Sequence, residues 1–136
     1  MESGLLDRIK AFEGYRRYAY NCCLGHLTIG YVTMIAEGGH GVAEYVGEIR
    51  LQDYLTTIQS GLKVYDWFTD LDTPRQHCIL EMAYQMGVEG VLAFRNMIQS
   101  IERKDWQSAG VHALDSLWAK QTPVRARDVA ERLVQG

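Results

Sequence analysis

Apolar residues recur at helical spacing in two parts of the N-terminal half of the chain. Within 5–12 they lie three or four positions apart, which predicts one face of a helix, and Gly14 stands where that helix would end. Glu13 is therefore expected in its last turn. From about Glu48 to Leu62 the same spacing predicts a long amphipathic helix.

The chain between these two helices has a different pattern. The stretch from Tyr18 to Val32 is rich in Tyr, Thr, Ile and Val and contains Gly25, which predicts a short β hairpin with a turn. The segment from Gly38 to Gly41 is mostly glycine and predicts a loop. A small β-containing region is thus expected between the first helix and the long one.

The C-terminal half predicts a series of helices. Thr73 suits an N-cap, Pro74 suits the first helical position and Gln76 completes a capping box, so a helix should start here. We expect this helix to stop at Gly87. Further helices are expected over about 94–103, over about 105–120 with Asp105 as its N-cap, and from Pro123 to about Val134.

Together these elements predict an α+β fold. It would contain a small N-terminal β hairpin, a long connecting helix and a C-terminal helical lobe, with a cleft between the two parts. At 136 residues the chain has the length of one domain.

Composition and charge narrow the classes of function. With 47% hydrophobic and 23% charged residues the chain is typical of a globular protein, and no apolar run approaches the ~20 residues of a membrane span. The net charge of −3 argues against a nucleic-acid binder, which normally carries a basic face. The first residues lack the features of a signal peptide, so we expect the protein to stay where it is synthesised until something releases it.

The cysteines give no framework for disulfides. Cys22, Cys23 and Cys78 are odd in number and irregularly spaced, which predicts free thiols in a reducing compartment. Cys22 and Cys23 lie close to His26 in the sequence, but no fourth ligand for a metal is obvious. We therefore expect no metal and no cofactor.

Candidate chemistry is concentrated in one short segment. Glu13, Cys22 and Thr28 supply an acid, a thiol and a hydroxyl, and a helix end followed by a hairpin would bring them to one wall of the cleft. Taken singly, each has a structural interpretation, namely a solvated helix-end residue, a space-filling thiol and an ordinary strand residue. Their combination favours a catalytic site.

The spacing Glu13-x8-Cys22-x5-Thr28 within FEGYRRYAYNCCLGHLTIGY resembles the catalytic segment of the phage-type lysozymes, glycoside hydrolase family 24. The resemblance resumes in YQMGVEGVLAFRNM, at Trp106 and Trp118, and in WAKQTPVRAR. It covers nearly the whole chain in the same order and is weakest over about 32–73.

This resemblance implies a single lysozyme-like domain over 1–136 with two lobes. A small β-containing lobe would occupy about 14–47, and the N-terminal helix would join about 62–136 in a helical lobe. The implied activity is that of a muramidase, which hydrolyses the β-1,4 bond between N-acetylmuramic acid and N-acetylglucosamine in peptidoglycan.

The resemblance also implies roles for individual residues. Glu13 matches the general acid, which must hold a proton near neutral pH, and Thr28 matches the hydroxyl that holds the attacking water. Arg125 matches an arginine that pairs with the catalytic glutamate. Because an arginine alone would lower the pKa of a carboxyl group, this pair would position Glu13 while burial supplies the opposing shift. Tyr84 and Gln85 match residues that line the cleft and contact the sugar chain.

The chain departs from the family pattern at Cys22, where most members have aspartate. Three alternatives are open: the thiol acts as a nucleophile through a covalent glycosyl intermediate, it acts as a weak base while Thr28 orders the water, or the site is largely inactive. A second departure follows Thr28. Family members commonly have the pattern T-I-G-x-G-H, but this chain lacks the second glycine and the histidine, so we expect an altered hairpin geometry. The chain is also acidic, whereas several relatives are basic.

The leading functional hypothesis is a phage or prophage endolysin that acts on the glycan strands of peptidoglycan. It would remain in the host cytoplasm until a holin-type membrane protein gives it access to the periplasm and the cell wall, and it would act as a monomer without nucleic acid. The alternative is a non-catalytic module, in which a muramidase fold binds glycan or another protein. Cys22 and the altered segment after Thr28 support this alternative.

Overall fold

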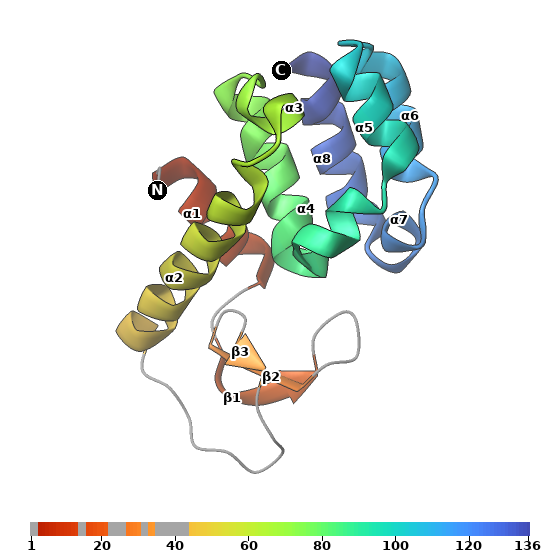
Figure 1. Ribbon diagram of the computed structural model, residues 1–136. Helices are drawn as coiled ribbons and strands as arrows, with labels where there is room; N and C mark the ends of the chain where they lie inside the picture. Colours follow the sequence, from red (N-terminus) through yellow and green to blue (C-terminus); the bar gives the residue numbers. More distant parts are fainter. Residues whose placement is uncertain (1–2, 14–15, 22–26, 31–32, 35–43) are drawn as a thin grey trace. The chain divides into compact units, whose positions relative to one another are not determined.

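A computed structural model of the chain describes residues 3–13, 16–21, 27–30, 33–34 and 44–136 (Figure 1). The chain divides into two compact units, Met1–Thr56 and Thr57–Gly136.

The unit Met1–Thr56 contains a helix, a small sheet and the beginning of a second helix. Its elements are α1 (Ser3–Glu13), β1 (Arg16–Asn21), β2 (Leu27–Gly30), β3 (Thr33–Met34) and most of α2 (Glu44–Leu62). The strands pair antiparallel in the order β1-β2-β3. Thr28 lies in the central strand, opposite Tyr20 on one side and Met34 on the other.

The two helices of this unit each bury an apolar stripe. Leu5 and Ile9 of α1 are fully buried, as are Leu51 and Leu55 of α2. In both helices the buried residues are four positions apart, as one face of a helix requires. Lys10 of α1 forms an ion pair with Glu48 of α2, which links the two helices.

The unit Thr57–Gly136 is helical throughout its regular structure. After the end of α2 come α3 (Asp66–Thr69), α4 (Thr73–Leu92), α5 (Arg95–Glu102), α6 (Trp106–Leu114), α7 (Leu117–Gln121) and α8 (Pro123–Gln135). α8 packs against α4, α6 and α7, and α5 packs against α6 (Figure 1). Fully buried side chains on these two helices include Ile79, Met82 and Ala83 of α4 and Val129 and Leu133 of α8.

The expected fold class is wrong. Helices make up most of the described chain, whereas the strands are only six, four and two residues long. The chain is therefore mainly helical rather than an α+β fold with a β-hairpin lobe. The strand-forming residues occupy one short stretch, whereas helical periodicity continues through nearly all of 44–135.

The start of α4 also differs from expectation in its cap. Asp72, not Thr73, is the N-cap residue, and no side chain caps this end. The Gln76 side-chain amide instead donates to the backbone carbonyls of Phe68 and Thr69, at 3.2 Å and 3.5 Å. The carbonyls at the end of α3 thus bind the side chain that a capping box would have used.

As predicted, the regular helix is interrupted at Gly87: two helical segments meet there across a kink, and α4 as a whole ends at Leu92. Gly87 has φ of 79° and ψ of 166°, a backbone conformation that is open to glycine and strained for other residues. The glycine therefore redirects the helix immediately after the segment that contains Tyr84 and Gln85.

The helix predicted over 105–120 is two helices. Asp105 caps the first as predicted, because its carboxylate accepts from the Ser108 N–H and hydroxyl at 3.3 Å and 2.8 Å. Ser116 then starts the second, since its hydroxyl oxygen accepts from the Ala119 N–H at 3.1 Å. The second cap explains why α6 stops at Leu114 and a new axis begins with α7.

Arg75 ties the start of α4 to the end of α8. Its guanidinium donates to the carbonyls of Leu133 and Val134 at 2.7 Å and 2.9 Å. Its guanidinium carbon also lies 3.9 Å from the centre of the Trp106 ring on α6. One cation therefore satisfies carbonyls at a helix C-terminus and stacks on an aromatic ring. Among the described helices, none is both long and apolar enough to cross a membrane.

The close approach of α6 to α8 predicts a cost for adding one methyl group. A Cβ at Gly110 would lie 2.7 Å from Val134 Cγ2, so Gly110→Ala should lower the free energy of unfolding by about 1–3 kcal/mol, measured by urea unfolding. Gly4→Ala in α1 is the matched control, because its Cβ would meet no atom within 4 Å. Equal stability of the two variants would contradict the close packing.

The cap of α6 predicts a pH-dependent contribution to stability. Hydrogen bonds from the Ser108 side chain and backbone lower the pKa of Asp105 below its ordinary value of 3.8. A lowered pKa in the folded state means that the contribution is complete above the unfolded pKa and is lost as the pH falls through the folded one. Asp105→Asn keeps an acceptor that does not titrate. The difference in Tm between wild type and this variant should therefore shrink between about pH 5 and about pH 2, and a constant difference would contradict it.

Candidate functional site

The predicted catalytic residues all belong to the unit Met1–Thr56. Glu13 is the last residue of α1, as the pattern around Gly14 predicted, and Thr28 is in β2. Cys22 follows the end of β1 and lies outside the described residues, as do Cys23 and His26. The structure thus gives Glu13 and Thr28 a place in the backbone, and the role of Cys22 stays a prediction.

Tyr84 and Arg125 are brought together in the unit Thr57–Gly136. The guanidinium carbon of Arg125, on α8, lies 5.8 Å from the centre of the Tyr84 ring, on α4. Tyr84 is 2% exposed and Arg125 is 6% exposed. A cation at this distance from an aromatic ring is attracted to its face, so α4 and α8 hold each other's side chains here.

Gln85 is oriented by a tryptophan. The indole N–H of Trp118, on α7, donates to Oε1 of Gln85 at 2.7 Å. The Trp118 ring also meets Phe94 edge to face, with ring centres 6.3 Å apart. A buried indole needs an acceptor for its N–H. Here the acceptor is the Gln85 side-chain amide, which is predicted to contact sugar, and the hydrogen bond holds its orientation.

A buried charge on α4 was missed by reasoning from the sequence. Glu81 is fully buried, and its Oε2 forms an ion pair with Nη2 of Arg132, on α8, at 2.8 Å. Arg132 also contacts Asp128 at 2.9 Å. Burial acts to lower the pKa of Arg132, but Glu81 raises it and the net shift is upward, so the guanidinium stays charged. The signal available in the sequence was a single acidic residue within the apolar run Ile79–Ala83.

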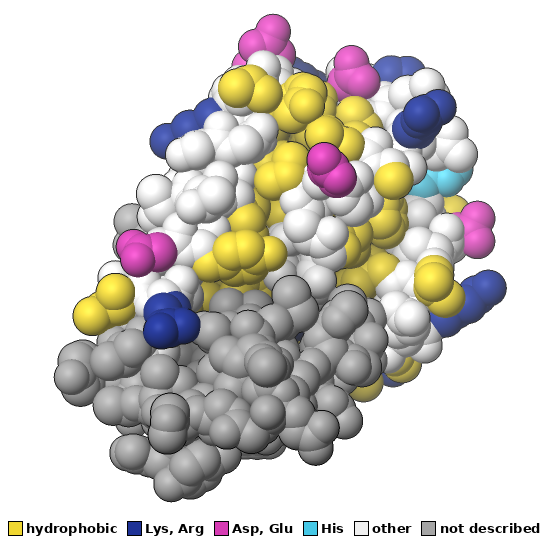
Figure 2. Space-filling model, turned by 60° about the horizontal axis from the view of Figure 1, so that its bottom comes forward, with side chains coloured by type: hydrophobic (Ala, Val, Ile, Leu, Met, Phe, Trp, Pro, Cys, Tyr) yellow, Lys and Arg dark blue, Asp and Glu magenta, His cyan; other side chains and the backbone are white. Residues whose placement is uncertain are grey.

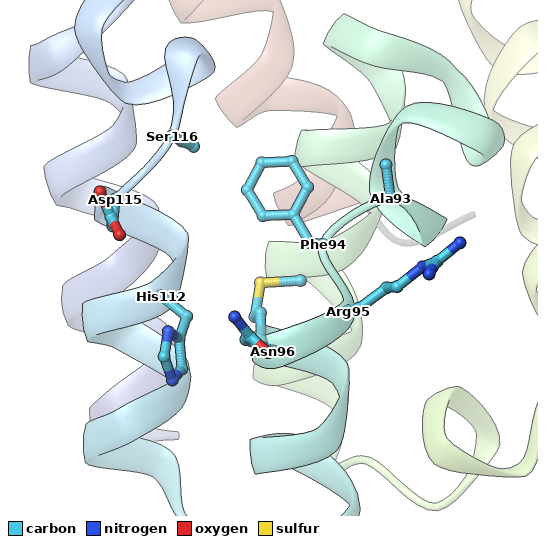
Figure 3. Close-up of a pocket in the computed structure, with 8 residues that line it drawn as sticks. Ala93, Phe94, Arg95, Asn96, His112, Asp115 and Ser116 are labelled. Atoms are coloured by element: carbon cyan, nitrogen blue, oxygen red, sulfur yellow. The ribbon is translucent and has the colours of Figure 1, made fainter.

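A pocket of about 230 Å³ opens between α5 and α6 (Figure 3). Asn96 and His112 lie on its two sides, and the Phe94 ring lies away from them, toward Ser116 (Figure 3). Asp115 and Ser116 add further polar groups at one side. A lining that mixes apolar and polar side chains suits an amphipathic group. Because Phe94 contacts Trp118, the pocket adjoins the hydrogen bond to Gln85.

The described surface carries charges of both signs. On the face in Figure 2, Lys and Arg side chains are interspersed with Asp and Glu, and the described residues there form no continuous basic patch. Within the part of the chain that the structure describes, no three His, Cys, Asp or Glu side chains are grouped as a metal site would require.

Comparisons with known proteins identify the family. Residues 10–134 match the family model described as phage lysozyme. An alignment of 164 residues with "Probable T4-type lysozyme 1" of Dictyostelium discoideum shows 29% identity. It covers the whole of this chain and 96% of the relative. "Probable T4-type lysozyme 2" of the same organism is 26% identical over 95% of this chain and 92% of its own length.

A further match is to part of a larger phage protein. The pre-baseplate central spike protein Gp5 of Enterobacteria phage T4 is 36% identical over 65% of this chain, which corresponds to 16% of the spike protein. The range matched by the family model spans the positions of all the predicted site residues, namely Glu13, Cys22, Thr28, Tyr84, Gln85 and Arg125. The resemblance noted from the sequence is therefore confirmed, and the chain belongs to the phage lysozyme family of glycoside hydrolases.

Proposed function

We propose that this protein is a peptidoglycan muramidase that hydrolyses the β-1,4 bond between N-acetylmuramic acid and N-acetylglucosamine. The observation that carries the proposal is the family match across 10–134, which begins before Glu13 and ends beyond Arg125. The lysozyme names of the two full-length relatives support it.

Glu13 is proposed as the general acid that protonates the leaving glycosidic oxygen. Its place at the end of α1 supports this role. The C-terminal end of a helix carries partial negative charge, which disfavours a carboxylate there and favours the protonated acid. A general acid must hold its proton until the bond breaks.

Cys22 and Thr28 are proposed to supply the second half of the reaction. In one route the Cys22 thiolate attacks the anomeric carbon as Glu13 protonates the leaving oxygen, and water activated by Glu13 then hydrolyses the glycosyl–sulfur bond. In the other route Thr28 holds a water, Cys22 accepts its proton, and the water oxygen bonds directly to the anomeric carbon. Both routes keep Glu13 as the acid, so replacing Glu13 tests them together.

Gln85 is proposed to contact the sugar chain, with Tyr84 and Arg125 in supporting roles. The hydrogen bond from Trp118 supports this proposal, because an amide whose orientation is already fixed loses little freedom when a ligand binds. The proximity of Arg125 to Tyr84 supports a shared structural task for these two residues.

The proposed biological role is lysis of a host bacterium at the end of a phage infection. The enzyme would act in the periplasm and on the cell wall after a holin-type protein permeabilises the inner membrane, and it would act as a monomer. A virion-associated role is favoured by one observation, the match to a segment of a phage spike protein. A non-catalytic module is the second candidate function, and Cys22 in place of the usual aspartate favours it.

Lysis assays separate the catalytic from the non-catalytic hypothesis. Wild type should clear a suspension of Gram-negative cells stripped of their outer membrane, and Glu13→Gln should reduce the rate by about 10²- to 10⁴-fold because the general acid is lost. Alkylation of thiols should inhibit wild type if Cys22 takes part. Cys22→Ser, alkylated in parallel, controls for modification of Cys23 and Cys78.

Each outcome of these assays decides a different point. No lysis by folded wild type at high concentration would reject the muramidase proposal in favour of a binding module. Lysis that is unaffected by Glu13→Gln would reject the assignment of the acid. Lysis that survives both alkylation and Cys22→Ser would exclude Cys22 from the chemistry.

The tryptophan that holds Gln85 generates a separate prediction. Trp118→Phe keeps a ring against Phe94 but removes the N–H donor, so KM for soluble peptidoglycan fragments should rise about five- to tenfold through loss of one hydrogen bond. Trp106→Phe is the matched control, because that ring stacks under Arg75. A KM that rises equally in both variants would contradict a specific role for Trp118.

A further inference from the structure

Glu81 is an unusual residue at the centre of a helical core. It is fully buried on α4 beside the equally buried Leu80 and Met82, and it forms an ion pair with Arg132 of α8. A carboxylate removed from water is strongly unfavourable unless a cation and hydrogen bonds compensate it. The position of α4 against α8 must therefore keep these two side chains in contact.

Stability alone is a weak explanation for such a pair. Replacing a buried ion pair with well-packed apolar residues is often neutral or stabilising, because the cost of desolvating both charges is avoided. What a buried pair adds is a defined arrangement, since a shift or rotation of one helix would separate the charges. Glu81 and Arg132 thus select one packing of α4 on α8.

That packing is linked to Gln85 by a closed ring of contacts. Gln85 is four residues after Glu81, about one helical turn or 6 Å further along α4. Gln85 accepts the Trp118 hydrogen bond from α7. The carbonyl of Trp118 accepts at 2.9 Å from the hydroxyl of Thr122, the residue immediately before α8. The ion pair between Arg132 of α8 and Glu81 of α4 closes the ring.

Two other contacts show that α4 and α8 run antiparallel with the ion pair between their ends. Arg75, in the first turn of α4, binds the carbonyls of Leu133 and Val134. Tyr84, further along α4, meets Arg125 near the start of α8. The Glu81–Arg132 pair lies between these points on α4 and fixes the rotation of the turn that carries Gln85.

We propose that Glu81 is a positioning residue, whose ion pair with Arg132 sets the orientation of Gln85 toward Trp118 for sugar binding. The part concerning sugar rests on the muramidase function proposed above, whereas the part concerning the Gln85–Trp118 hydrogen bond does not. The two parts can be tested separately.

The test compares the double variant Glu81→Leu/Arg132→Met with Asp128→Asn and with wild type. Asp128→Asn is the matched control, because it removes the ion pair within α8 and leaves the pair between helices. The first readout is the indole N–H resonance of Trp118 in a two-dimensional NMR spectrum, assigned with Trp118→Phe. The second is KM and kcat on soluble peptidoglycan fragments.

In the folded double variant, the Trp118 indole resonance should shift and its hydrogen should exchange with solvent at least about fivefold faster than in wild type. KM should rise about three- to tenfold, with kcat changed less. Asp128→Asn should leave both readouts as in wild type. A folded double variant with an unchanged Trp118 resonance would overturn the positioning role.

Two further outcomes keep the test decisive. If the double variant does not fold, Glu81→Gln decides, because it removes the charge while keeping a similar shape and an acceptor; a shifted Trp118 resonance supports the proposal and an unchanged one overturns it. If wild type is inactive but the double variant shifts the resonance, the positioning of Gln85 stands and the muramidase function fails.

Discussion

The packing of the unit Thr57–Gly136 depends on one charge placed inside it. Glu81 has no access to water, so the chain must supply a cation at its carboxylate, and Arg132 does so from α8. This requirement makes the contact between α4 and α8 specific, where apolar side chains alone would tolerate small shifts. Arg75 and Arg125 then define the contact at either side of the pair.

The local elements of the fold were largely predictable from the sequence, because helices with an apolar face leave a periodic signature. The long helix expected over about 48–62 is α2, Glu44–Leu62, and the predicted cap at Asp105 is present. A predicted cap was wrong where a side chain forms hydrogen bonds with a neighbouring helix instead. Gln76 was expected to complete a cap, but carbonyls at the end of α3 bind its amide. The predicted fold class was wrong because the strand-forming residues are confined to one short stretch, whereas helices make up most of the described chain.

The candidate site was predictable in a different way. Gly14 located Glu13 at the end of a helix, but the roles of Glu13, Thr28 and Arg125 came from the family resemblance and not from their spacing. Glu81 was missed because a lone acidic residue in a helical segment usually faces solvent. Its partner Arg132 is on α8, which is distant from α4 in the sequence, and no local sequence pattern encodes that contact.

The kink at Gly87 has a stereochemical consequence. A Cβ at this position would meet no atom within 4 Å, so space does not explain the preference for glycine. The obstacle is a φ of 79°, which the L configuration disfavours and its mirror image adopts readily. The junction after Gln85 therefore discriminates by handedness: a D-residue introduced by chemical synthesis would adopt this φ without the backbone strain that ordinary genetically encoded L-residues meet.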